Sequence, residues 1–164
     1  MSGLFLKENV LLRPGFIEIQ QIRKQRNEAN ENTFIKREKR NTANKIVKAK
    51  IEQVAIFKGQ RDLMNGKVNE YKKLRDKAVR RRDETGLQTL IDYYDGLQDH
   101  FHSMVNQFAI ESEYYQKLMD DESNEISRIR DIANTFHKES ISARFDADDI
   151  HKRLVSATES IEEE

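Results

Sequence analysis

Histidine and carboxylate side chains are where this sequence could hold a metal ion, because it has four histidines and no cysteine. His100 and His102 lie two residues apart, a spacing that turns their side chains about 200° from each other on an α-helix, so one ion cannot take both. Asp148 and His151 have the i, i+3 spacing of a ligand pair. Helical di-metal sites need a second such pair and further glutamates, and the sequence offers no second copy. The sequence therefore predicts no metal site.

The sequence also contains no pattern of residues that is typical of a catalytic site. Glu122 and Glu125 share a helix face, but acids beside Arg128 on a long helix are typical of solvated ion pairs. His137 is interpreted as a surface or flanking residue. No phosphate-binding glycine loop, activated nucleophile motif or zinc spacing occurs. We therefore expect a protein that is not an enzyme and binds neither a cofactor nor a small-molecule substrate.

A basic cluster is the strongest feature for ligand binding. Such a patch attracts phosphate groups of nucleic acid or anionic lipid. Against this reading, the acids Asp92, Asp95 and Asp99 are expected alongside after folding, and no exposed aromatics interleave to stack bases. Nucleic-acid or anionic-membrane binding therefore stays the alternative function. The residues of this anionic-ligand patch are Lys72, Lys73, Arg75, Lys77, Arg80, Arg81 and Arg82.

The charges divide unequally between the two halves of the chain. Of the 29 basic and 29 acidic residues, residues 1–82 hold 22 basic and 9 acidic, and residues 83–164 hold the remaining 7 and 20. The halves thus carry +13 and −13. Packing one half against the other within a hairpin offsets these charges, whereas parallel pairing of identical arms would not.

The elements that carry these residues are long helices. Apolar residues alternate three and four apart from Leu87 to Phe136, which places one apolar stripe along one side of a helix roughly 75 Å long. Such a helix needs a partner to cover its stripe. A weaker heptad pattern runs from Phe34 to Arg82, interrupted at Gly59 and Asn65-Gly66. A turn at Asn65-Gly66, which would split this arm, stays open as an alternative.

A turn at residues 83–86 is predicted to join the two arms, with Thr85 as N-cap and Gln88 as its partner in a capping box. Folding about this turn sets Tyr71 opposite Leu97 and brings Arg61 near Glu111 and Lys50 near Glu122. An intermolecular antiparallel dimer, in which each basic arm covers the acidic arm of another chain, is the alternative. The residues of the predicted coiled-coil seam are Val54, Phe57, Arg61, Met64, Val68, Tyr71, Leu87, Leu90, Tyr94, Leu97, Phe101, Met104, Phe108, Glu111, Tyr115 and Leu118.

The N-terminal segment is the predicted partner-binding element, because a two-helix rod offers little groove in which to bury it. Pro14-Gly15 separates it from the rod. Its apolar residues are Leu4, Phe5, Leu6, Val10, Leu11 and Leu12. The predicted organisation is an N-terminal docking segment and short helix (1–33), a basic arm (34–82), a turn (83–86), an acidic-side arm (87–139), and a short C-terminal helix with an acidic tail (140–164).

Together these patterns predict an all-α fold, an elongated antiparallel coiled-coil helical hairpin with short accessory helices at both ends. Architecture alone is similar to secretion-apparatus stalk proteins and phage structural components. The expected function is that of a structural or adaptor subunit of a larger assembly of the secretion-apparatus or phage and virion type. It would work through protein–protein contacts, including self-association. No signal peptide or membrane-spanning stretch is predicted, so we expect a cytoplasmic or assembly-incorporated protein.

Overall fold

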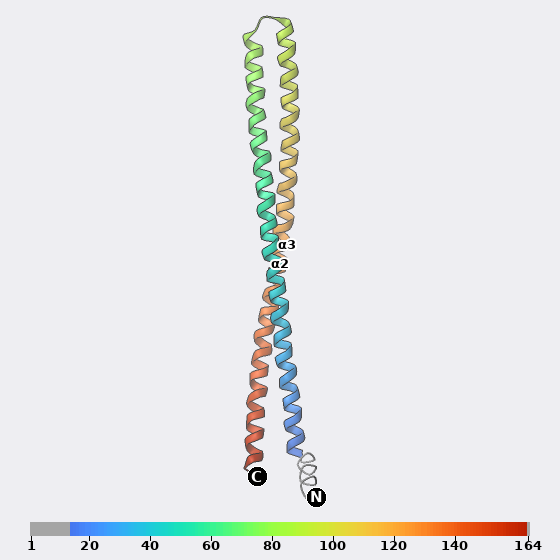
Figure 1. Ribbon diagram of the computed structural model, residues 1–164, viewed down its shortest axis with the longest axis vertical. Coiled ribbons are helices and arrows are strands. Elements are labelled where there is room, and N and C mark those ends of the chain that lie inside the picture. Colours follow the sequence, from blue (N-terminus) through green and yellow to red (C-terminus); the bar gives the residue numbers. More distant parts are fainter. Residues whose placement is uncertain (1–13, 164) are drawn as a thin grey trace, which may run out of the picture. The chain divides into compact units, whose positions relative to one another are not determined.

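Two long helices account for the fold. The computed structural model describes residues 14–163, in which α2 runs from Pro14 to Glu84 and α3 from Gln88 to Glu162. They pack antiparallel as a helical hairpin, joined by residues 85–87 (Figure 1). The predicted all-α helical hairpin is confirmed.

The accessory helices expected at both ends are not separate elements. Residues 16–33 continue directly into the basic arm within α2, and residues 140–162 continue the acidic-side arm within α3. Nor is there a turn at Asn65-Gly66, where α2 is uninterrupted. The polar run around residues 27–33 contains neither proline nor glycine, so nothing in it forces a helix to stop. The expectation of accessory helices was therefore wrong for the described residues.

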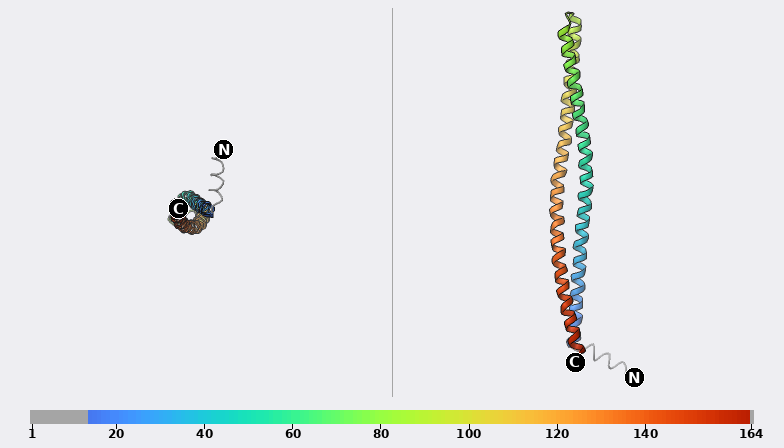
Figure 2. Two further views of the ribbon diagram at one scale, coloured as in Figure 1. Left: turned by 90° about the horizontal axis from the view of Figure 1, so that it is seen from below. Right: turned by 90° about the vertical axis from the view of Figure 1, so that its left-hand side faces the viewer.

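The hairpin consists of two compact units. The loop-side unit is Val47–Arg128, and the terminal unit combines the chain up to Ile46 with Ile129 onward. Each unit contains one stretch of α2 and one of α3, which Figures 1 and 2 show side by side in views at right angles. Blue and red mark the terminal unit, and green and yellow mark the loop-side unit around the connection.

Small side chains fill many of the buried positions between the helices. In α3, Ser112, Ala133, Ser140 and Ala147 are buried, and their numbers differ by multiples of seven, so they share one row of the helix. This row lies beside the predicted stripe rather than within it. The buried residues are Ile19, Ile22, Ala43, Val47, Ala78, Val105, Ser112, Ile126, Ile129, Ala133, Ser140, Ala143, Ala147 and Leu154.

The connection differs from the predicted capping box. The Thr85 hydroxyl accepts a bond from the Leu87 N–H at 3.4 Å, and the Gln88 amide donates to Asp92 at 2.9 Å instead of reaching back to Thr85. The Leu87 carbonyl accepts from the amides of Leu90 and Ile91, each at 3.0 Å. The Leu87 carbonyl thus accepts the first hydrogen bonds of α3, so Leu87 is the N-cap residue of this helix. The predicted turn at 83–86 thus moves to residues 85–87.

In the terminal unit, an apolar cluster joins the first turns of α2 to the last turns of α3. Ile19, Ile22 and Leu154 are buried together, and Ile150 and Ile161 pack against them. A Cβ atom added at Gly15 would lie 3.0 Å from the Ile161 side chain. Gly15 thus leaves the space that this isoleucine occupies.

Candidate interaction surfaces

A ladder of polar contacts crosses between the helices within each unit. Arg40, Arg61, Arg75 and Arg82 have numbers that differ by multiples of seven and therefore share one face of α2. Their contacts on α3 are His137 at 2.7 Å, Gln116 at 2.6 Å, His102 at 3.5 Å and Asp95 at 3.0 Å. Two lysines on the neighbouring row form ion pairs, Lys36 with Glu139 at 2.6 Å and Lys50 with Glu122 at 3.0 Å. These interactions fix the register more than they add stability, because polar seam residues restrict which alignments satisfy their partners.

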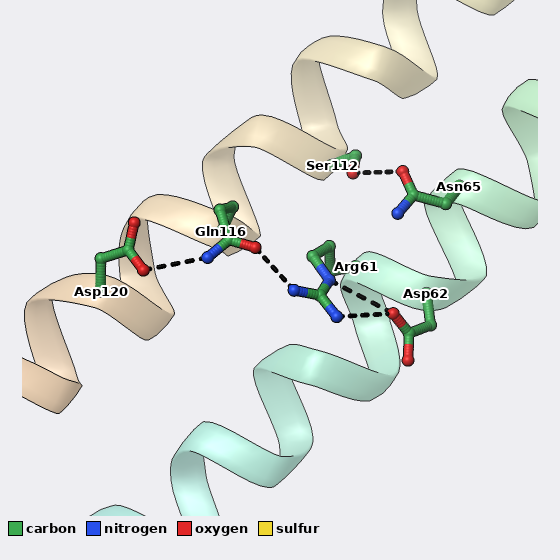
Figure 3. A network of polar contacts seen from close by, with 6 residues as sticks. All are labelled: Arg61, Asp62, Asn65, Ser112, Gln116 and Asp120. Carbon is green, nitrogen blue, oxygen red and sulfur yellow. Dashed lines mark hydrogen bonds and ion pairs between the residues drawn. The ribbon is translucent and has the colours of Figure 1, made fainter.

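The densest part of this ladder lies in the loop-side unit (Figure 3). Arg61 donates to Gln116 across the helices and to Asp62 on its own helix at 2.9 Å, and Gln116 in turn donates to Asp120 at 2.9 Å. One turn nearer the connection, the Ser112 hydroxyl donates to the Asn65 amide oxygen at 2.6 Å. The cross-helix partner of Arg61 is therefore Gln116 rather than the expected Glu111. Lys50, by contrast, pairs with Glu122, the acid near which the sequence places it.

A double-mutant cycle on Arg61→Ala and Gln116→Ala is expected to give a favourable coupling of about 1 kcal/mol, the size of a partly exposed hydrogen bond. Urea unfolding of the wild-type chain, both single variants and the double variant measures it. The pair Arg61 and Glu111 is the matched control and should couple more weakly. Stronger coupling with Glu111 would show that the register predicted from the sequence holds in solution.

The acids around residue 125 divide between the two helices. Glu122 pairs with Lys50 on α2, whereas Glu125 pairs with Arg128 one turn along α3. The hydrogen bond from Arg128 lowers the pKa of the Glu125 carboxyl from its ordinary value. The same bond raises the pKa of Arg128. Because both groups are exposed to solvent, this pair contributes little to stability.

The histidines lie on separate contacts. His102 and His137 face arginines of α2, and the His100 ring lies 5.7 Å from the Phe101 ring. His151 and Asp148 are both exposed. Across residues 14–163, no three histidine or acidic side chains are grouped closely enough to hold a metal ion.

Most of the basic cluster is exposed. Arg82 bonds Asp95, which raises the pKa of the guanidinium, and Arg75 contacts Asp76 and His102. The other five have no hydrogen bond or ion pair within the described part of the chain: Lys72, Lys73, Lys77, Arg80 and Arg81. Of the acids expected to offset the cluster, Asp95 alone pairs with it there. The cluster therefore keeps several unpaired cations.

A groove of about 560 Å³ lies between the helices of the terminal unit. Phe34 and Ile141, both exposed, line it together with Arg37, Arg40 and Arg144. Asp148 is its one acidic lining residue. The groove thus combines apolar surface with positive charge.

The predicted seam residues fall into two groups. On α2, Val54, Phe57, Met64, Val68 and Tyr71 are half-buried, as is Arg61. On α3, Leu87 and Leu90 are exposed, whereas the other predicted residues are half-buried: Tyr94, Leu97, Phe101, Met104, Phe108, Glu111, Tyr115 and Leu118. The six predicted residues of the N-terminal segment, Leu4, Phe5, Leu6, Val10, Leu11 and Leu12, lie outside the described residues.

Aromatic contacts tie the two helices together in the loop-side unit. The Tyr71 ring lies 5.6 Å from the Phe108 ring and 6.1 Å from the Phe101 ring, and Phe57 lies 6.4 Å from Tyr115. The sequence predicts Tyr71 opposite Leu97. The Tyr71 ring instead packs between two aromatic residues that are seven apart on α3.

Sequence reasoning missed the most buried row of α3. Val105, Ser112, Ile126, Ala133 and Ser140 belong to it, and several are too small or too polar to raise local hydropathy. A signal was nevertheless present, because serine and alanine recur at multiples of seven residues between positions 112 and 147. Searching for small residues at heptad spacing would have found this row.

No protein-family model, curated protein or solved structure matches this chain. Within residues 14–163, neither helix contains a stretch that is long and apolar enough to cross a membrane. The fold and its surfaces thus define the chain as an all-α helical hairpin.

Proposed function

We propose that the protein is a non-enzymatic structural or adaptor subunit of a larger macromolecular assembly and works through coiled-coil protein–protein contacts. The observation that carries the proposal is the apolar surface left outside the helix pair. Large apolar side chains with more than half of their surface exposed include Phe34, Ile56, Leu63, Ile110 and Phe145. Ile56 and Leu63 lie seven residues apart and so share one face of α2, and neighbouring apolar residues exposed on one face are suited to burial against a partner.

The polar ladder supports the same function. Cross-helix contacts such as Arg61 with Gln116 and Lys50 with Glu122 hold one register of α2 on α3 within the loop-side unit. A fixed register keeps the outward-facing residues of both helices in a constant arrangement. An adaptor needs such an arrangement, because its partners must find the same surface each time.

Removing residues 1–13 is expected to abolish incorporation into the assembly and to leave the helical signal and the melting temperature unchanged. The segment from Leu4 to Leu12 carries six large apolar residues, each worth roughly 1.5–3 kcal/mol when fully buried. The measurement compares tagged full-length and shortened chains in their native cells, by the size of the complex that contains each. Circular dichroism of both purified chains is the control. Early melting of the shortened chain would assign the segment to the protein's own core instead.

The unpaired cations favour a second candidate function, binding of nucleic acid or an anionic membrane through Lys72, Lys73, Lys77, Arg80 and Arg81. Phosphate contacts would give an affinity that falls steeply with salt. Titration of labelled DNA, RNA and anionic vesicles at increasing salt tests this candidate. Weak binding with a shallow slope supports the adaptor function, and tight binding with a steep slope, lost on charge reversal of the five residues, supports the alternative.

A further inference from the structure

We propose that two copies of the chain pair antiparallel through one face of the loop-side unit, with a two-fold axis at Met104. This inference specifies self-association among the contacts of the proposed function and so rests on it. The face is built from two neighbouring rows of α3 and two of α2. Each row carries apolar residues that its own hairpin leaves partly exposed.

The α3 side of this face has residues arranged almost symmetrically about Met104. Leu90 and Leu118 lie fourteen residues on either side of Met104. Tyr93 and Tyr114 are centred between residues 103 and 104, and they are 60% and 58% exposed. In an antiparallel two-fold pairing, a residue before the axis in one copy faces the residue that lies equally far after the axis in the other copy. Leucine then meets leucine, tyrosine meets tyrosine, and Met104 meets Met104.

One pair of facing residues on α3 is not apolar on both sides, and charged residues of α2 account for it. Leu97 lies opposite Glu111 of the second copy. Leu97 lines a groove of about 350 Å³ together with Leu74, Lys77 and Arg81 of α2. Neither these two cations nor Glu111 has an ion-pair partner within the described part of its own chain. The two-fold operation therefore carries each Glu111 to a groove rimmed by two unpaired positive charges.

The α2 side of the face supports the same axis independently. Leu74 of α2 and Leu97 of α3 line one groove and so lie at about the same level. Because the helices are antiparallel, Met104, seven residues after Leu97, lies level with Lys67, seven residues before Leu74. An axis within about two residues of this level places Leu63 opposite Leu74, both exposed, and sets the Lys67–Glu70 ion pair, 3.6 Å apart within each chain, against its own copy in reverse order. Apolar residues again meet apolar residues, and opposite charges meet. Parallel two-fold pairing would instead set α2 of each copy against α3 of the other, where leucine no longer meets leucine and tyrosine no longer meets tyrosine.

Charge reversal tests the pairing, with dissociation constants measured by sedimentation equilibrium of the full-length chain. Glu111→Lys alone, and Lys77→Glu with Arg81→Glu, should each weaken the homodimer about tenfold or more, because like charges meet twice per dimer. Mixing the two variants restores attraction at both grooves. The mixed dimer should therefore form more tightly than either homodimer. Equal or weaker association of the mixture would overturn the proposal.

Cysteine cross-linking places the axis, since the chain has no native cysteine. Met104→Cys should form an intermolecular disulfide rapidly under mild oxidation, while Asn106→Cys, exposed and about 200° around the helix from Met104, should not. Equal cross-linking of both variants would overturn the proposed axis. A wild-type chain that stays monomeric at every concentration would overturn the pairing. That result would leave the adaptor function standing, because one hairpin can still bridge other subunits, and the deletion of residues 1–13 tests that function separately.

Discussion

Replacing Tyr71 with alanine is expected to lower the free energy of unfolding by about 3 kcal/mol, the lower end of the range for removing a large aromatic side chain. Tyr71 contacts both Phe101 and Phe108 across the hairpin, so its loss leaves two rings without their partner. The lower end applies because the site is half-buried and can partly fill with water. Urea unfolding followed by circular dichroism measures the change.

Phe145→Ala is the matched control, because Phe145 is 66% exposed. It should cost less than about 0.5 kcal/mol, as surface substitutions do. A loss at Tyr71 no larger than that at Phe145 would contradict the packing of the aromatic residues between the helices in solution.

Enlarging Ala133 to leucine is expected to destabilise the hairpin by about 1–3 kcal/mol, the usual cost of overpacking a filled site. Ala133 is 4% exposed and lies in the buried row of α3. Three added carbon atoms must displace the facing helix or take a strained rotamer. The loss should appear in both thermal melting and urea unfolding.

Ala49→Leu provides the control, because Ala49 is exposed on α2 and both substitutions involve residues with similar helix propensity. This variant should differ from wild type by less than about 0.5 kcal/mol. If Ala133→Leu were instead stabilising, the interface around it would contain space that the structure does not show.

Helix content, the pairing of the two arms and the aromatic residues of α3 that contact α2 were predictable from the sequence, and the small residues of the most buried row of α3 were not. With one proline in the whole chain and long heptad patterns, few positions could end a helix. The choice of Leu90, Leu97 and Met104 as seam residues followed the heptad spacing of the large apolar residues. In the structure Leu90 is exposed and Leu97 and Met104 are half-buried, whereas Val105 and Ser112 are buried. Hydropathy favours the larger side chains, whereas close approach of two helices favours the smaller ones.

The sequence predicted that polar residues of the two helices would meet, but it did not identify every partner. Polar interruptions at Arg61 and Lys50 were expected to meet polar residues of α3, and Lys50 indeed pairs with Glu122. The partner of Arg61 differed because the long arginine side chain leans toward the N-terminus of α2 and so reaches Gln116, five residues beyond Glu111 on α3. The proposed dimer face could not be recognised beforehand, since five of its residues were assigned to the seam within the chain: Leu90, Leu97, Met104, Glu111 and Leu118.

The ladder of cross-helix contacts also determines an order of folding. Arg82 and Asp95 are 13 residues apart in the chain, Arg61 and Gln116 are 55 apart, and Arg40 and His137 are 97 apart. Closing the longest of these loops directly costs roughly 2 kcal/mol more in chain entropy than closing the shortest. Closure therefore starts beside the connection and proceeds outward like a zipper, each contact bringing the next pair together.

Synthesis on the ribosome adds a delay to this order, because all of α2 is made before any of α3. The arginines that form the ladder, Arg40, Arg61, Arg75 and Arg82, then stay in water beside the apolar residues of the same helix. Charge at these positions opposes association of one unpaired α2 with another, since like charges would meet. The row that sets the register in the finished hairpin thus also protects the nascent chain from premature pairing.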